Sequence, residues 1–127
     1  MGENCIKWSK IESKGVRTYQ RCYGAPFLLQ MSGSGLIAPC GQLFNEKFKK
    51  FHIGNITQKR FKKIWESERY WEVMSYLSSS YFNAQKMCGN LCLQHKVNEY
   101  LDGYKKGLIG LEKPASHVNK PQHLSFI

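Results

Sequence analysis

The sequence predicts a small α+β domain, with one two-stranded β-hairpin followed by two main α-helices and an extended C-terminal tail. Three observations support this class. Two short apolar runs flank a glycine-rich turn at 32–35, apolar residues recur at helical spacing over 58–77 and 89–104, and the residues after 106 contain prolines and little periodicity. A chain of 127 residues is long enough for one such domain.

The hairpin is expected at about 27–40, where "FLLQM" and "LIAP" stand on either side of "SGSG". Glycine supplies the positive φ that a tight hairpin turn needs. The polar stretch 1–21 has no clean period and is interpreted as an entry segment. The stretch 42–57 is expected to be a long connection, in which Gly54-Asn55 marks a turn.

The first helix, about 58–77, is amphipathic and can be interrupted near Ser67, with Asn55 or Thr57 as candidate caps. Its apolar positions are Phe61, Ile64, Trp65, Trp71, Met74 and Leu77. The stretch 78–86 is expected to be a loop. The second helix, about 89–104, places on one stripe Leu93, Val97, Tyr100, Leu101 and Tyr104.

The chain contains no run of about 18 apolar residues, and its N-terminus lacks the apolar stretch of a secretory signal. We therefore expect a cytoplasmic protein with no membrane partner. The net charge is +10, and lysines alternate with aromatics at 46–51 and 58–63. Such stretches can bind phosphate backbones and stack on bases, or they can coat the solvated face of a helix whose aromatics point inward. Helical spacing of the aromatics favours the second interpretation.

The five cysteines carry the strongest chemical signal, and in a reducing compartment cysteines more often bind metals or catalyse than form disulfides. Cys22 and Cys40 are expected together at the open end of the hairpin. Cys88 and Cys92, four residues apart at or just before a helix start, are expected to face one centre, where the helix dipole favours thiolates. Docking the second helix against the hairpin's open end would complete a set of four.

Four thiolates suit zinc or an iron–sulfur cluster. Structural zinc usually lies between two tight knuckles, whereas here one pair is 18 residues apart and the other four. The wide spacing favours the cluster. The alternative that these are ordinary buried cysteines fits one pair better than two converging pairs.

From Cys22 to about Leu101 the chain resembles the auxiliary-cluster domain, SPASM or its shortened "twitch" form, that follows the barrel of radical S-adenosylmethionine (SAM) enzymes. The family's glycine five residues before its second cysteine is Gly35, before Cys40 in "GLIAPC". Its "GNI" and short helix appear as "IGNITQKRFKKIWES", and its late cysteine pair and Asn-containing helix as "CGNLCLQHKVNEYL". The joint pattern is specific, although each part alone would be weak.

The resemblance implies one auxiliary [4Fe–4S] cluster held by Cys22, Cys40, Cys88 and Cys92, because a full SPASM domain has seven cysteines and two clusters. The radical-generating CxxxCxxC motif does not occur here. The resemblance therefore implies a non-autonomous domain of a radical SAM oxidoreductase, whose upstream barrel is its partner, binds S-adenosylmethionine and carries out the chemistry. The cluster would transfer electrons or position a peptide or small-molecule substrate.

On this interpretation residues 1–21 enter from an upstream domain, 22–106 form the cluster-binding domain and 107–127 form the tail. Cys5 lies outside the motif and is interpreted as a spare. His52 and His95 are candidate ligands, although surface or core roles fit them better. Two alternatives stay open: a stand-alone zinc-binding module with a basic nucleic-acid-binding surface, and an adaptor whose basic face meets an acidic protein.

Overall fold

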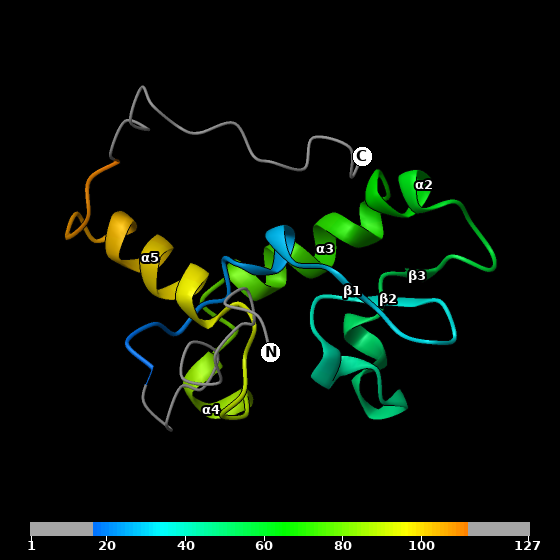
Figure 1. Ribbon diagram of the computed structural model, residues 1–127, viewed down its shortest axis with the longest axis horizontal. Coiled ribbons are helices and arrows are strands. Elements are labelled where there is room, and N and C mark those ends of the chain that lie inside the picture. Colours follow the sequence, from blue (N-terminus) through cyan, green and yellow to red (C-terminus); the bar gives the residue numbers. More distant parts are fainter. Residues whose placement is uncertain (1–16, 112–127) are drawn as a thin grey trace, which may run out of the picture.

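The computed structural model describes residues 17–111 and confirms the predicted small α+β class (Figure 1). Three short strands form one antiparallel sheet in the order β1-β2-β3: β1 (Gln30–Met31), β2 (Leu36–Ala38) and β3 (Gly54–Asn55). The α-helices are α2 (Phe61–Trp65), α3 (Glu68–Ser78), α4 (Ala84–Met87) and α5 (His95–Lys105). Three 3₁₀ helices complete the described chain: η1 (Ala25–Phe27), η2 (Gly41–Leu43) and η3 (Glu46–Phe51).

The prediction of only two strands is wrong, because a third strand pairs with the hairpin. Gly54, which the sequence places in a turn, pairs with Ile37 of β2, and Ile53 N donates to Ile37 O over 2.9 Å. A Cβ atom at Gly54 would lie 3.1 Å from the side chain of Ile64. Glycine therefore lets α2 pack closely on β3, which explains why a residue typical of turns stands in a strand.

The predicted interruption of the first helix near Ser67 is confirmed. Ser67 separates α2 from α3 and caps α3, since its hydroxyl accepts a hydrogen bond from Tyr70 N over 3.2 Å. The predicted cap of α2 is wrong. Its N-cap residue is Arg60, without a side-chain bond, and the side chain of Asn55 instead accepts from Thr57 N over 2.9 Å.

Helix α3 lies in the middle of the molecule, with the sheet and α2 towards one end and α4 and α5 towards the other (Figure 1). It buries Tyr70, Val73, Met74 and Leu77, at the spacing of one helical face. Residues from the segments that precede α5 join it in the core: Tyr19, Ala25, Ile37, Phe51, Ile53, Ile64, Phe82 and Ala84. Burial of this face is the main stabilising contribution to the fold.

The second predicted helix is shorter than expected and buries a different face. It begins at His95, and α4 occupies part of the stretch predicted as a loop. The predicted apolar stripe is wrong: Tyr100 and Tyr104 are exposed, whereas His95 and Asn98 are buried. The helix packs through polar side chains because they bond to partners on other segments, which periodicity of apolar residues cannot detect.

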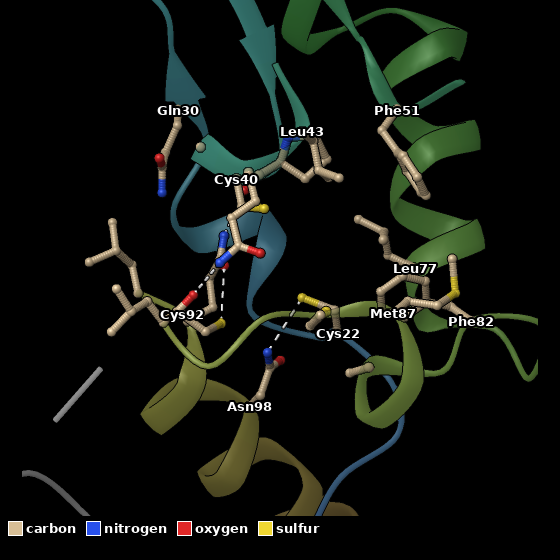
Figure 2. A pocket seen from close by; sticks show the side chains of 18 of the residues that line it. Cys22, Gln30, Cys40, Leu43, Phe51, Leu77, Phe82, Met87, Cys92 and Asn98 are labelled. Carbon is tan, nitrogen blue, oxygen red and sulfur yellow. Dashed lines mark hydrogen bonds between the residues drawn. The ribbon is translucent and has the colours of Figure 1, made fainter. Parts of the chain in front are cut away.

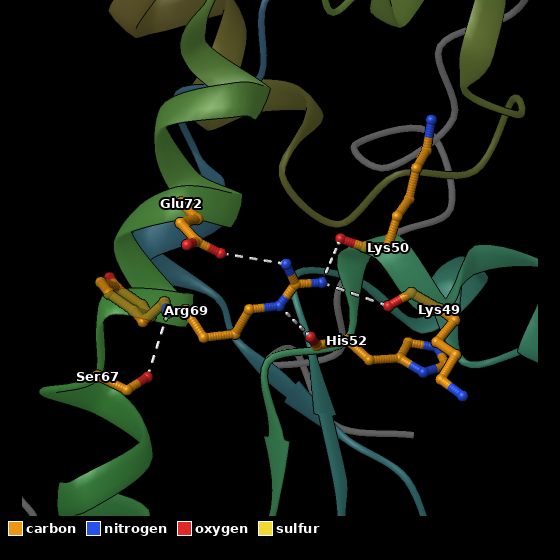
Figure 3. A network of polar contacts seen from close by, with 7 residues as sticks. Lys49, Lys50, His52, Ser67, Arg69 and Glu72 are labelled. Carbon is orange, nitrogen blue, oxygen red and sulfur yellow. Dashed lines mark hydrogen bonds and ion pairs between the residues drawn. The ribbon is translucent and has the colours of Figure 1, made fainter.

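Helix α3 is joined to η3 by Arg69, whose guanidinium donates to backbone carbonyls at the end of η3 (Figure 3). Its Nε donates to His52 O over 3.0 Å and its Nη2 to Lys50 O over 2.6 Å, while Nη1 pairs with Glu72 over 3.3 Å. The guanidinium thus satisfies carbonyls that the 3₁₀ helix leaves free at its end.

The two basic, aromatic stretches differ in their burial. In η3, Phe51 is 3% exposed, as the solvated-face interpretation predicts. In the 58–63 stretch that interpretation is wrong, because Phe61 is 46% exposed beside exposed lysines. Among residues 17–111, no helix is both long enough and apolar enough to cross a membrane.

Gly35 provides a test of the hairpin turn. It adopts φ +83°, and a Cβ atom there would lie 2.8 Å from Asn55 Oδ1 and 2.9 Å from Ile56 Cγ1. We expect Gly35→Ala to lower the free energy of unfolding by more than the roughly 1–2 kcal/mol that a left-handed conformation costs alone. Urea denaturation measures the loss. Gly33→Ala, in the same turn with no neighbouring atom within 4 Å, is the matched control and should change stability little.

Candidate metal centre

All four cysteines of the predicted quartet line one cavity of about 310 Å³. Figure 2 shows Cys22, Cys40 and Cys92 around this space, with Leu77 and Phe82 on its apolar side. The wall is mainly hydrophobic, and its polar members include Arg17, Tyr19, Gln94 and Asn98. A largely apolar cavity with several converging thiols is a candidate site for a metal cofactor.

Each cysteine comes from a different local structure. Cys22 precedes η1, and its backbone N donates to Leu77 O over 2.9 Å, which ties it to the end of α3. Cys40 follows β2 and is the N-cap residue of η2. Cys88 is the C-cap residue of α4, and Cys92 lies in the connection to α5, where its carbonyl accepts from His95 N over 3.1 Å.

The expected helical placement of Cys88 and Cys92 is therefore wrong, although both reach the same cavity. They lie in the connection between α4 and α5, with Cys88 in extended backbone at φ −102° and ψ 146°. A connection rather than a helical turn presents the two thiols, because α4 ends at Met87 and α5 begins only at His95.

The four cysteines line the cavity without forming a ready site for a single metal ion. Over the part of the chain that the structure describes, no three Cys, His, Asp or Glu side chains are close enough to hold one metal ion. Zinc would draw four sulfurs to within about 2.3 Å of a single point. In a cluster each iron takes its own thiolate, so more widely separated cysteines fit a cluster better than a single ion.

Two buried amide side chains of the α5 region join the cysteine-bearing segments. Gln94 donates through Nε2 to Pro39 O over 2.6 Å, beside Cys40, and its Oε1 lies 3.7 Å from Cys92 Sγ. Asn98 donates through Nδ2 to Cys22 Sγ over 3.4 Å and accepts at Oδ1 from Gly24 N over 2.7 Å. Donors to cysteine sulfur are among the groups that tune iron–sulfur sites.

A third amide side chain holds the connection that carries Cys88 and Cys92. Gln42 of η2 donates through Nε2 to Leu91 O and accepts at Oε1 from Gly89 N over 3.3 Å. The roles of Gln42 and Gln94 are not predicted from the sequence, since neither residue belongs to a motif or to a periodic set of apolar residues. Asn98 had a signal, because the family's late helix contains an asparagine.

Neither histidine joins the cysteines as a ligand in this arrangement. His52 donates through Nε2 to Leu43 O over 2.7 Å. His95 is 4% exposed, with Nδ1 2.8 Å from Tyr19 Oη and Nε2 3.1 Å from a Glu99 oxygen. Burial lowers the pKa of His95, so its neutral form can donate to Glu99 and accept from Tyr19. Cys5 lies outside the described residues.

Burial raises the pKa of the thiols of Cys22, Cys40 and Cys88, the last to about 12. Thiolate charges on neighbouring cysteines add to the rise, and Arg17 opposes it at Cys88. Without a metal ion the cavity therefore favours neutral thiols, even with Arg17 at its wall. Iron reverses this preference, because its positive charge stabilises coordinated thiolates, so metal binding must release protons.

The raised thiol pKa values predict the pH dependence of the metal-free, reduced chain. A group whose pKa is higher in the folded state stabilises the fold below its unfolded pKa, about 8.5 for cysteine, and that contribution falls as pH rises towards the folded value. We therefore expect the melting temperature to change little near pH 7 and to decline as the pH rises from about 8.5 towards 12. Replacing Cys88 by Ser removes the most strongly shifted thiol and should flatten the decline; an identical slope in this variant would contradict the assignment.

Comparison with known families supports a metal-binding interpretation. The family model for SPASM, described as an iron-sulfur cluster-binding domain, matches residues 22–93. The matched range contains all four cysteines that line the cavity. No significant match was found among curated proteins or among solved structures.

Proposed function

Because the chain belongs to the SPASM family of iron-sulfur cluster-binding domains, we propose that Cys22, Cys40, Cys88 and Cys92 hold one auxiliary [4Fe–4S] cluster in the cavity. Membership of the family implies auxiliary cluster binding, as in radical SAM enzymes, and such domains typically accompany a radical SAM catalytic domain. The number and type of cluster and the four ligands are our inference.

The observation that carries the proposal is the convergence of all four cysteines on one cavity from segments up to 70 residues apart. Buried cysteines that only fill space have no reason to meet at one place. Because the four cysteines share this cavity, thiolate charges on Cys22, Cys40 and Cys92 would raise the pKa of Cys88 further, beyond the larger effect of burial.

The residues that line the cavity fit a [4Fe–4S] cluster. Four thiols match the four irons of the cluster, the apolar wall supplies a site of low dielectric, and Asn98 provides a hydrogen-bond donor to one sulfur. When bound, the cluster would supply one-electron chemistry. Ligation by four cysteines would leave no iron open to substrate, which favours electron transfer over direct substrate ligation.

The residues around the cavity would set the reduction potential of the cluster. Leu77, Phe82 and the other apolar side chains limit water around the sulfurs, while Asn98 donates to Cys22 Sγ and Gln94 donates to the Pro39 carbonyl beside Cys40. Burial and hydrogen bonds to sulfur are the two main means by which proteins adjust cluster potentials. An upstream radical SAM barrel is the proposed electron partner, acting on a peptide or small-molecule substrate.

Anaerobic reconstitution tests this function. The 127-residue chain is incubated with iron and sulfide under reducing conditions, desalted, and analysed for both elements, visible absorption and electron paramagnetic resonance after reduction. Four irons and four sulfides per chain with broad visible absorption are expected. One tightly held zinc and no retained iron, in a parallel reconstitution with both metals, would overturn the cluster in favour of a zinc module.

A further inference from the structure

Arg17 places a buried positive charge at the wall of the cysteine cavity. Its side chain is 8% exposed, lines the cavity and lowers the pKa of Cys88 by its charge. It lies outside residues 22–93, so the family match does not include it. An arginine almost removed from water needs a specific reason, because burying a charge is costly unless it is compensated.

The guanidinium is held against the cysteine-bearing connection by hydrogen bonds. Nη1 donates to Cys88 O over 3.4 Å, and Nη2 donates to the next carbonyl, Gly89 O. The backbone carbonyl of Arg17 accepts from Gln85 Nε2 of α4 over 2.7 Å. Both the side chain and the backbone of Arg17 thus bind to the region around Cys88.

Within residues 17–111, these contacts do not complete the charge balance of Arg17. In that range its Nε is buried without a hydrogen-bond partner, and none of the ion pairs found there includes it. The carbonyls of Cys88 and Gly89 accept hydrogen bonds from the guanidinium, but they do not neutralise its positive charge. A buried arginine of this kind is stabilised by an anion close to it.

We propose that Arg17 is the counter-charge of the cluster site, where it raises the reduction potential of the bound cluster and holds the Cys88 connection in place. The proposal rests on the proposed function, since a four-cysteine cluster supplies the negative charge. Reduction adds one electron from an external reductant and makes the cluster more negative. A nearby buried cation stabilises that state more than the oxidised one, because Coulomb interactions are strong in a site of low dielectric.

The choice of arginine agrees with both parts of this role. Its planar fork can bond two successive carbonyls at once, which a lysine ammonium group does less well. An arginine guanidinium is not deprotonated in proteins. Arg17→Lys therefore keeps the charge and weakens the fork, whereas Arg17→Gln keeps a hydrogen-bond donor and removes the charge.

The test is a redox titration of the reconstituted chain and its variants, followed by electron paramagnetic resonance with dithionite as reductant. We expect Arg17→Gln to shift the reduction equilibrium about tenfold towards the oxidised state, or about 59 mV to more negative potential for one electron. Arg17→Lys should stay near the parent value. Lys86→Gln removes an equal charge from the exposed face of α4 and is the matched control; solvent screening should keep its potential near that of the parent.

Each result decides the proposal. Equal potentials for the parent, Arg17→Lys and Arg17→Gln overturn it, even when all three hold the cluster. If Arg17→Gln holds too little cluster to titrate, the proposal requires that Arg17→Lys retains iron and sulfide at the parent level. Loss of iron and sulfide in both variants would overturn the role of the charge. A parent chain without any cluster is a failure of the proposed function itself, and is recognised before a variant is made.

Discussion

Replacing Cys22, Cys40, Cys88 or Cys92 by Ala, one at a time, should yield a chain that loses most of its iron and acid-labile sulfide on desalting. Residues that only orient metal ligands typically contribute about 10–100-fold to affinity, and a lost ligand should cost more. The four variants should behave alike, because all four side chains line one cavity. Iron and sulfide analysis with visible absorption after reconstitution measures the effect.

Cys5→Ala is the matched control for this series. Cys5 lies outside the described residues and outside the range matched by the family model, so its replacement should leave iron and sulfide unchanged. If Cys5→Ala loses the cluster while one of the four retains it in full, Cys5 is a ligand and the quartet is wrong. Far-ultraviolet circular dichroism of each metal-free variant separates loss of a ligand from loss of the fold.

Leu77→Ala should produce a large loss of stability. Leu77 is 2% exposed, belongs to the buried face of α3 and lines the cysteine cavity. Removing a buried leucine side chain costs about 2–5 kcal/mol, because its apolar contacts are lost and the space left behind collapses only in part. That is a large share of the roughly 5–15 kcal/mol by which domains are usually stable.

Urea denaturation of the metal-free and reconstituted chains measures this effect. The backbone bond from Cys22 N to Leu77 O is retained in the variant, so the substitution tests packing rather than the tether itself. Leu108→Ala makes the same chemical change at a side chain that is 78% exposed, and should alter stability by no more than about 0.5 kcal/mol. Equal losses in the two variants would falsify the assignment of Leu77 to the core.

The local features of the fold were predictable because their causes lie within a few residues. The turn of the hairpin follows from glycine, and the break between α2 and α3 follows from Ser67, whose hydroxyl caps the helix that starts after it. The third strand was missed. Gly54 pairs with Ile37 and leaves room for the side chain of Ile64, contacts that are distant in the sequence, whereas an isolated Gly-Asn pair indicates a turn equally well.

The cysteine residues and the family could also be predicted from the sequence, because the family pattern consists of particular residue types at fixed spacings. Hairpin geometry, helical spacing and the family resemblance all indicate Cys22, Cys40, Cys88 and Cys92, and the structure brings all four to one cavity. The local geometry assumed for Cys88 and Cys92 was nevertheless wrong. Short helices such as α4 lack a clear period, so their ends cannot be predicted reliably.

By itself the sequence determined the α+β class, the family and the four cysteines, because each is expressed in local composition or in fixed spacing. Only the tertiary structure decided what surrounds those cysteines. Asn98 meets Gly24 across 74 positions and Gln94 meets Pro39 across 55, while Arg17 reaches Cys88 across 71. Such polar contacts have no periodicity along the chain. They exist because the fold brings the hairpin's end and the α4–α5 connection together at one cavity, where buried polar groups must find partners.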